Sequence, residues 1–180
     1  MITSVKGTAA LVGPPTVVVV TGVPGAGKTT LGAALATELD APFISLDSIK
    51  ERLDPAGGWD PRELRLAAEK ELSAHLDAVR GTVVVDIWIA PHRDTARIAS
   101  LLSRKAVDIV EVLCRVSADI AVGRYAERSR SAPHRPPDAA TLARIRAAVD
   151  EIESLPVGRC IEVDTSERAD VKRLIERINR

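Results

Sequence analysis

One stretch of the sequence, residues 22–29, has residue types and spacing that indicate phosphate chemistry, because GVPGAGKT fits G-x-x-x-x-G-K-[ST] without a mismatch. Glycines let such a loop curl its N–H groups inward around an anion, and a following helix adds the positive end of its dipole. We expect Lys28 to reach the β- and γ-phosphates of ATP, and the Thr29 hydroxyl to ligate Mg²⁺. The residues expected to contact nucleotide are Gly22, Val23, Pro24, Gly25, Ala26, Gly27, Lys28, Thr29 and Thr30.

The residues on either side of this loop support the same interpretation. Four consecutive valines at 17–20 predict a buried central strand, and residues 29–38 read as a helix. The alternative is a glycine-rich turn between strand and helix in which the lysine is fortuitous. The strand before the loop and the helix after it are the context that a phosphate-binding loop requires, so they count against that alternative.

Asp47 follows a second predicted strand at 41–46 and begins a predicted helix, with Lys50 one helical turn later. An aspartate there is able to accept the proton of a substrate hydroxyl as the hydroxyl attacks a γ-phosphoryl group, while Lys50 neutralises charge. The alternative is that Asp47 only caps the helix. We expect Asp47 to be catalytic, and Asp47 and Lys50 to contact the acceptor substrate.

Asp86 lies near the end of a third predicted strand, 82–87, and Trp88 follows two residues later. An acid at this position holds Mg²⁺, usually through water, or hydrogen-bonds an acceptor; a charged residue that is merely solvated is the alternative. Trp88 is placed to form a wall of the acceptor pocket, although a core position is equally compatible with its type.

The segment 124–137 contains several arginines and is broken by prolines, which is typical of a lid that closes over a nucleotide. Arg124 and Arg128 share a helix face at i, i+4, and Arg130 and Arg135 follow. Arginines so placed stabilise the negative charge of a phosphoryl group in transfer, whereas a solvated basic face is the alternative. Residues 164–170 follow the last predicted strand and either pass beside a nucleobase or serve as a loop and helix cap.

Strands and helices alternate along the whole chain, which predicts a parallel sheet covered by helices on both faces, with the ligand crevice beyond the strands' carboxyl ends. Residues 1–15 read as a loose leader that ends at Gly-Pro-Pro, and 16–180 as a single α/β domain. The predicted strands are 17–20, 41–46, 82–87, 107–116 and 159–163. The predicted helices are 29–38, 47–53, 61–79, 92–105, 117–130, 138–155 and 166–180.

Composition limits the classes of function. Lysine plus arginine and aspartate plus glutamate are both 25, which argues against a globally basic nucleic-acid binder. Aromatic residues make up only 2% of the chain, so the core must be built from valine, leucine, isoleucine and alanine. No signal peptide or membrane span is apparent, and we expect a cytoplasmic protein in which Cys114 and Cys160 are structural thiols. The oligomeric state is not predicted.

Five motifs in this order, GVPGAGKTT, SLDSI, VVVDIW, AVGRYAER and IEVDTS, resemble those of the P-loop small-molecule kinases. That group includes adenylate, gluconate and shikimate kinases, zeta toxins and polynucleotide kinases, and the chain looks most like the chloramphenicol phosphotransferase-like proteins. The resemblance implies strand order 2, 3, 1, 4, 5, Asp47 as general base, and Arg124 and Arg128 as a lid pair near adenine and the phosphates. The chain departs from the chloramphenicol enzymes in having a single acid, Asp86, where they have two, and in the stretch 48–90.

These observations favour an ATP- and Mg²⁺-dependent kinase that transfers the γ-phosphoryl group to a hydroxyl of a small molecule, such as an antibiotic, nucleoside or sugar. Asp47, Lys28 and Arg128 are the expected catalytic residues. One alternative is a 5′-hydroxyl polynucleotide kinase, which requires a basic channel leading to Asp47. The other is a nucleotide-binding regulatory NTPase that is not a kinase, which requires a partner surface that changes with the nucleotide.

Overall fold

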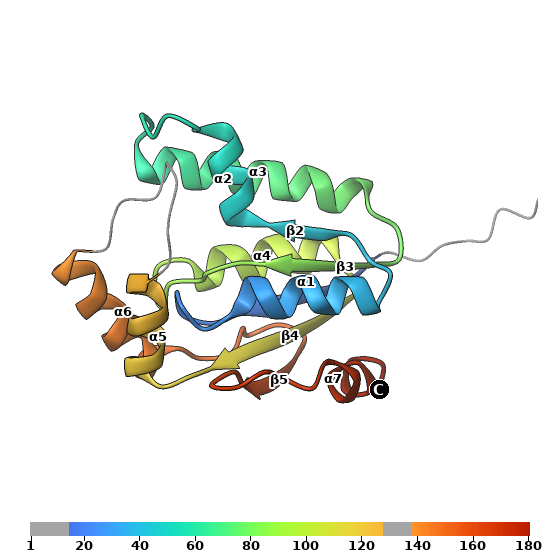
Figure 1. Ribbon diagram of the computed structural model, residues 1–180. Helices are drawn as coiled ribbons and strands as arrows, with labels where there is room; N and C mark the ends of the chain where they lie inside the picture. The colour runs from blue at the N-terminus through green and yellow to red at the C-terminus, as the bar shows by residue number, and fades with distance from the viewer. Residues whose placement is uncertain (1–14, 128–137) are drawn as a thin grey trace, which may run out of the picture.

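The computed structural model describes residues 15–127 and 138–180, and its sheet has the predicted topology (Figure 1). Five parallel strands lie in the order β2-β3-β1-β4-β5, which confirms the expectation. The strands are β1 (Thr16–Thr21), β2 (Phe43–Ser45), β3 (Thr82–Asp86), β4 (Asp108–Arg115) and β5 (Arg159–Asp164). Residues 1–14 of the predicted leader lie outside the described residues, as do Arg128, Arg130 and Arg135 of the predicted lid segment.

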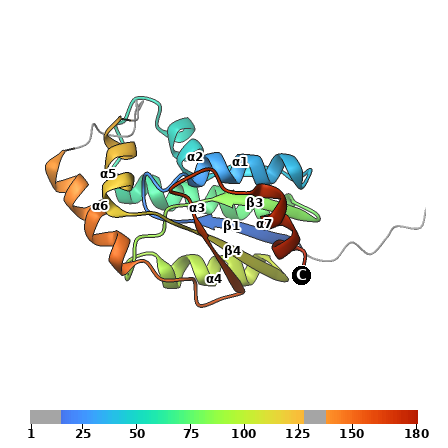
Figure 2. The ribbon, with the colours of Figure 1, turned by 60° about the horizontal axis from the view of Figure 1, so that its bottom comes forward.

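The helices form two outer layers around the sheet (Figures 1 and 2). One apolar cluster joins β1 to α1 and α7, and the other joins the opposite face of β1 to α3 and α4. The α/β three-layer class is therefore confirmed. The helices are α1 (Lys28–Glu38), α2 (Leu46–Leu53), α3 (Pro61–Ala78), α4 (Thr95–Lys105), α5 (Ala118–Glu127), α6 (Ala139–Glu151) and α7 (Val171–Ile178).

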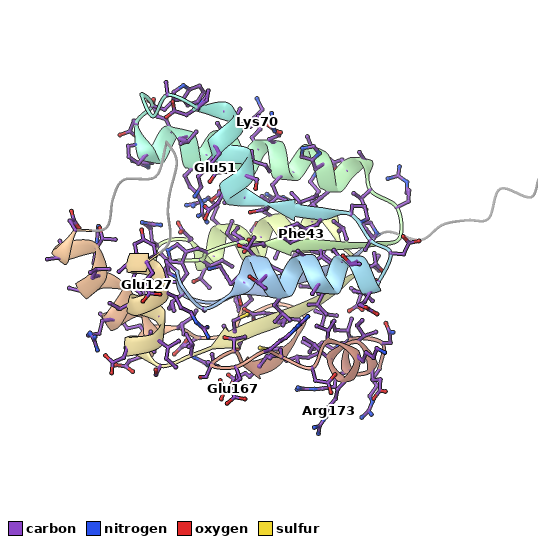
Figure 3. The ribbon with its side chains drawn as sticks, in the orientation of Figure 1. Phe43, Glu51, Lys70, Glu127, Glu167 and Arg173 are labelled. Carbon is purple, nitrogen blue, oxygen red and sulfur yellow. The ribbon has the colours of Figure 1, made fainter. Side chains whose placement is uncertain are left out.

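The central strand is buried on both faces because its side chains are nearly all valine. Val17, Val18, Val19 and Val20 each have no exposed surface, and alternate valines contribute to the two apolar clusters. At the edge of the sheet, Phe43 of β2 packs on α1 (Figure 3). A Cβ atom on Gly32 of α1 would lie only 2.7 Å from the Phe43 ring, so this contact depends on the missing side chain.

Three predicted helix boundaries are wrong, and each has a local cause. The helix predicted from 92 begins only at Thr95, because His92 has a left-handed φ of 59°. The helix predicted to 155 ends at Glu151, where the next residue, Ile152, has an extended conformation. The helix predicted from 166 begins at Val171, because Asp170 caps it by accepting a hydrogen bond from the N–H of Arg173.

The strand register brings the polar carboxyl ends of the strands to one end of the sheet. Asp86 pairs with Val20 of β1 on one side and with Ser45 of β2 on the other, so β1, β2 and β3 end at the same level. The phosphate-binding loop begins directly beyond this level, after Thr21. The fold therefore places the motif residues of three strands beside one another, as the parallel topology predicts.

No helix among the described residues is long and apolar enough to cross a membrane.

The two cysteines are both free thiols: Cys114 is buried in β4 and Cys160 is exposed in β5. Burial raises the pKa of the Cys114 thiol to about 12, which keeps it protonated and unreactive at neutral pH.

Candidate active site

The phosphate-binding loop connects β1 to α1 and turns at glycines with left-handed backbone. Gly25 and Gly27 have φ angles of 87° and 84°. The N–H of Ala26 donates to the carbonyl of Val23 at 3.1 Å, and Lys28 Nζ donates to the same carbonyl at 3.1 Å. Gly27 occupies the N-cap of α1 without a capping side chain, so the first N–H groups of this helix stay available to an anion.

Gly22 is the point where the loop leaves β1. A Cβ atom there would lie 2.8 Å from the carbonyl oxygen of Cys114 on β4, so a side chain would push the loop off the sheet. The remaining predicted loop residues are the half-buried Pro24 and the exposed Thr30 at the start of α1.

Thr29 and Asp86 meet at the end of this loop. The Thr29 hydroxyl donates to Asp86 Oδ2 at 2.7 Å, across 57 positions of sequence. The Ser45 hydroxyl, at the end of β2, donates to the same carboxylate oxygen at 3.3 Å. Asp86 is only 4% exposed, so its carboxylate is held by two hydroxyl groups rather than solvated. The alternative of a solvated strand end is therefore wrong.

Asp47 lies in the first turn of α2 and is not the residue that caps it. Ser45 is the N-cap, with its hydroxyl accepting from the N–H of Ser48, so the interpretation of Asp47 as a helix cap is wrong. Lys50 Nζ donates to Asp47 Oδ1 at 2.6 Å, one helical turn along. The predicted pair thus exists as a contact, at the same edge of the sheet as Asp86.

Arg124 ties α5 to the segment that follows β5. Its Nη1 donates to the carbonyl of Thr165 at 2.8 Å, and its Nη2 donates to the carbonyl of Ser166 at 2.7 Å. The Thr165 hydroxyl in turn donates to the carbonyl of Ala26 in the phosphate-binding loop at 2.7 Å. Arg124 is therefore no freely solvated surface charge. Asp164 accepts a hydrogen bond from the N–H of Ser166 at 2.8 Å, as a loop cap does.

A cavity of about 830 Å³ lies between the α2–α3 connection and the start of α4. Lys50 and Trp88 both line it, and Trp88 also packs partly against the core. Trp59, 48% exposed, stands at its edge. The described residues that line it are Lys50, Asp54, Gly57, Trp59, Pro61, Arg62, Leu64, Arg65, Leu66, Trp88, Arg93, Asp94 and Arg97.

Three arginines and two carboxylates form a cluster at this cavity, which we call the arginine wall: Arg65, Arg93, Arg97 and Asp94 line the cavity, and Glu69 is paired with two of the arginines. Arg93 donates to both oxygens of Asp94, and Arg97 donates to both oxygens of Glu69 and to Asp94. Arg65 Nε donates to Glu69 at 2.6 Å and Nη2 to the carbonyl of Trp88 at 3.0 Å. The two carboxylates are buried and fully paired.

The arginine wall keeps its carboxylates ionised. Burial by itself raises the pKa of Asp94, but the hydrogen bond from Arg93 and the charge of Arg65 outweigh it, and the pKa falls to about 2. Burial likewise raises the pKa of Glu69, and the hydrogen bonds from Arg97 and Arg65 lower it overall. The hydrogen bond to Asp94 raises the pKa of Arg93. The wall is therefore charged throughout the physiological range.

The low pKa of Asp94 predicts an acid-sensitive contribution to stability. Because the pKa falls on folding from 3.8 to about 2, the contribution is complete above pH 4 and is lost as the pH falls from about 4 to 2. Its size is about 2 kcal/mol by linkage. Urea unfolding between pH 2 and 5 should show that the free energy of unfolding falls less over that window for Asp94→Asn than for wild type. The control is Asp108→Asn, at the exposed start of β4, which should fall as wild type does. If the free energy of unfolding changed equally with pH in all three proteins, Asp94 would not be the source of the acid-sensitive contribution.

Sequence reasoning did not find the arginine wall. Arg65 and Glu69 are i, i+4 on α3, which is a signal for a pair, but buried charges on a helix face are hard to distinguish from a solvated face. The contact of Glu69 with Arg97 spans 28 positions and joins two helices, and nothing local predicts it. Thr165 lies in the segment 164–170 that the sequence analysis singled out, but its contact with the phosphate-binding loop was not predicted.

The comparison with known families agrees with this geometry. The profile of the family AAA_33, described as an AAA domain, matches residues 17–152, which include β1 from its second residue, the phosphate-binding loop and the described lining of the cavity. The chain belongs to the AAA_33 family. The predicted resemblance of this AAA_33 protein to the P-loop kinases is therefore confirmed.

Solved structures similar to this AAA_33 protein have the P-loop kinase fold. A protein from Chloroflexus aurantiacus described as a candidate kinase is 27% identical, with a TM-score of 0.75, over 93% of this chain and 98% of that one. Shikimate kinase from Acinetobacter baumannii is 20% identical, with a TM-score of 0.65, over 92% of this chain and 90% of that one. Gluconokinase from Sinorhizobium meliloti is 20% identical, with a TM-score of 0.58, over 92% of this chain and 96% of that one. At 20% identity, the last two show the fold alone.

A curated relative is the cytidylate kinase of Ignicoccus hospitalis, which is 37% identical over 92 residues. The alignment covers 44% of this chain and 54% of the relative, so the chain spans about half the length of the curated relative it matches. The match supports nucleotide binding and a kinase-type fold for this AAA_33 protein.

Proposed function

We propose that the protein is an ATP- and Mg²⁺-dependent kinase that transfers the γ-phosphoryl group to a hydroxyl of a small molecule. The observation that carries this proposal is the contact of Thr29 with Asp86 at 2.7 Å, which joins the phosphate-binding loop to the third strand. The cavity lined by Lys50 and by Trp88, which follows Asp86 by two residues, is within the size range of pockets that bind metabolites. A P-loop, together with an acceptor-sized cavity that is lined by the partner of Asp47, favours phosphoryl transfer over simple nucleotide binding.

The donor half of the site is assigned to the phosphate-binding loop. The N–H groups of the loop and of the first turn of α1 would bind the phosphates, and Lys28 would turn from the Val23 carbonyl to the β- and γ-phosphates. Arg124 would keep α5 and residues 165–166 together beside the nucleotide. Arg128, which we assign to charge stabilisation, lies outside the described residues.

The chemistry of the donor groups suits magnesium. Mg²⁺ is bound in such sites by one or two protein oxygens together with substrate phosphates and water, which is what Thr29 and Asp86 can supply. Among the described residues there is no group of three or more acidic, histidine or cysteine side chains that could hold a metal, and this kind of site does not need one. When bound, the ion neutralises charge on the β- and γ-phosphates.

Asp47 and Lys50 are assigned to the acceptor hydroxyl. Asp47 would take the hydroxyl proton as the oxygen attacks the γ-phosphorus and the bond to the β–γ bridging oxygen breaks, which leaves ADP and a phosphate ester. Lys50 lines the cavity and contacts Asp47 at 2.6 Å, so it would orient the carboxylate and offset negative charge. This role separates Asp47 from the other acid, Asp86, which is held by hydroxyl groups.

The test is a transfer assay with γ-labelled ATP, Mg²⁺ and a broad panel of hydroxyl compounds, with the phosphorylated product identified by mass. We expect a small-molecule phosphate ester and an equal amount of ADP. Labelled single-stranded oligonucleotide as the sole product would assign the 5′-hydroxyl polynucleotide kinase instead. Slow ATP hydrolysis with no transfer to any acceptor, and a partner that binds according to the nucleotide, would assign the regulatory NTPase.

A further inference from the structure

The arginine wall has more positive than negative charge, and its positive groups are held in fixed positions. Three guanidinium groups face two carboxylates, and the carboxylates lie beneath the surface: the Asp94 side chain is 1% exposed and that of Glu69 is 5% exposed. Two of the arginines are more open, with side-chain exposures of 67% for Arg93 and 40% for Arg97, and the third, Arg65, is 11% exposed. Buried acids therefore anchor arginines whose outer parts reach the cavity.

Each of the three guanidinium groups uses the same edge for these contacts. Arg65, Arg93 and Arg97 donate through Nε and Nη2 to the carboxylates and to the carbonyl of Trp88. Within the described part of the chain, none of the three forms a hydrogen bond through Nη1. A guanidinium has five N–H donors in a rigid planar fork, so donors remain on every arginine of the wall.

Donors that are anchored in this way are suited to bind an anion. An arginine held by a buried carboxylate has already lost its conformational freedom on folding, so binding a ligand costs little additional entropy. Guanidinium groups match the planar oxygens of a carboxylate and the oxygens of a phosphate better than they match a neutral hydroxyl. The excess positive charge of the wall favours a negative ligand for the same reason.

The arginine wall and the lysine that contacts the proposed base line one cavity. Lys50, which contacts Asp47, lines the same space as Arg65, Arg93 and Arg97. At about 830 Å³ the cavity accommodates a metabolite that presents a hydroxyl to Asp47 and an anionic group to the wall at the same time.

We infer that the acceptor substrate carries a carboxylate or phosphate group in addition to its reacting hydroxyl, and that the arginine wall binds this group. The inference rests on the proposed function, because it takes the cavity to be the acceptor site. It narrows the acceptor from any small hydroxyl compound to hydroxy acids and phosphorylated alcohols.

The two tryptophans of the sequence provide a direct measurement, because Trp59 and Trp88 both line this cavity. Intrinsic fluorescence is followed while the protein, with its phosphate-binding loop saturated by MgADP, is titrated with matched pairs. Two pairs, gluconate with glucose and shikimate with its methyl ester, test whether the site binds a carboxylate. A third pair, cytidine 5′-monophosphate with cytidine, tests whether it binds a phosphate. We expect at least one charged member to bind about tenfold or more tightly than its neutral partner, and the responding pair identifies the anion.

Arg93→Met tests the wall itself, since Arg93 is the most exposed of its arginines and Asp94 keeps Arg97 and Arg65 as partners. We expect binding of the charged member to weaken about tenfold and binding of the neutral member to stay the same, with partial rescue by Arg93→Lys. The matched control is Arg104→Met in α4, the helix that begins just after Arg93, where the guanidinium donates to Ser100 outside the cavity lining. A thermal unfolding curve checks that each variant is folded.

Equal binding of charged and neutral members, binding of neither, or an Arg93→Met variant that binds the anion as wild type does would each overturn the inference. Its failure is distinguishable from failure of the proposed kinase. If neutral hydroxyl compounds are phosphorylated as fast as charged ones, the kinase stands and the anionic acceptor does not. If no compound is phosphorylated while Arg93-dependent anion binding persists, the anion site stands and the kinase does not.

Discussion

The Asp47→Asn variant is expected to transfer phosphoryl groups about 10³-fold more slowly than the wild-type protein while it binds ATP with similar affinity. Asparagine has nearly the same shape as aspartate but does not accept the hydroxyl proton. The loss should therefore appear in kcat, because the interaction that is removed develops during the reaction. Steady-state kinetics at saturating ATP, with nucleotide binding measured separately, checks both parts of this expectation.

The same exchange at Asp40 is the matched control. Asp40 follows the C-terminus of α1, whereas the phosphate-binding loop precedes the N-terminus of that helix, so the two lie at opposite ends of it. Asp40 has a left-handed φ of 49°, which asparagine also tolerates. Asp40→Asn should keep the wild-type rate. An Asp47→Asn variant that is folded, binds ATP and transfers at the wild-type rate would rule out Asp47 as the base, and the hydroxyl proton would then need another acceptor.

The centre of the sheet was predictable because β1 and β3 are short valine-rich runs that end in polar residues. The valines of 17–20 and 83–85 have no exposed surface, and such runs are typical of parallel strands covered on both faces. Helix ends were less predictable because tertiary contacts set them. Glu111, buried in β4, accepts a hydrogen bond from the N–H of Leu155, and so holds residues 152–155 in a connection rather than a helix.

The two halves of the site differed in how much the sequence revealed. The donor half is local: the loop is one contiguous motif, and Asp86 reaches Thr29 because parallel strands end at a common edge. The acceptor half depends on pairings between α3 and α4, such as Glu69 with Arg97, which are separated by 28 positions. Charge pairs of that kind leave no periodic pattern in a sequence, so the arginine wall is not predictable from the sequence alone.

The Gly25→Ala variant is expected to lose about 3 kcal/mol of stability or more, and about tenfold or more of its nucleotide affinity. Gly25 has a left-handed φ of 87°, which by itself costs an alanine about 1–2 kcal/mol. A Cβ atom there would also lie 2.1 Å from the carbonyl oxygen of Ala121 on α5, which is backbone and has no rotamer by which to move aside. The loop and α5 must therefore separate.

Such a separation has consequences beyond the loop, because α5 carries Arg124 and is linked through it to residues 165–166. We expect a fall in Tm of about 10 °C, together with weaker binding of ATP measured by titration. Gly123→Ala is the matched control: this glycine lies within α5, a Cβ atom there meets nothing within 4 Å, and alanine should raise stability by about 0.5–1 kcal/mol. If Gly25→Ala matched Gly123→Ala in both measurements, the close packing of the phosphate-binding loop on α5 would not be needed to bind nucleotide.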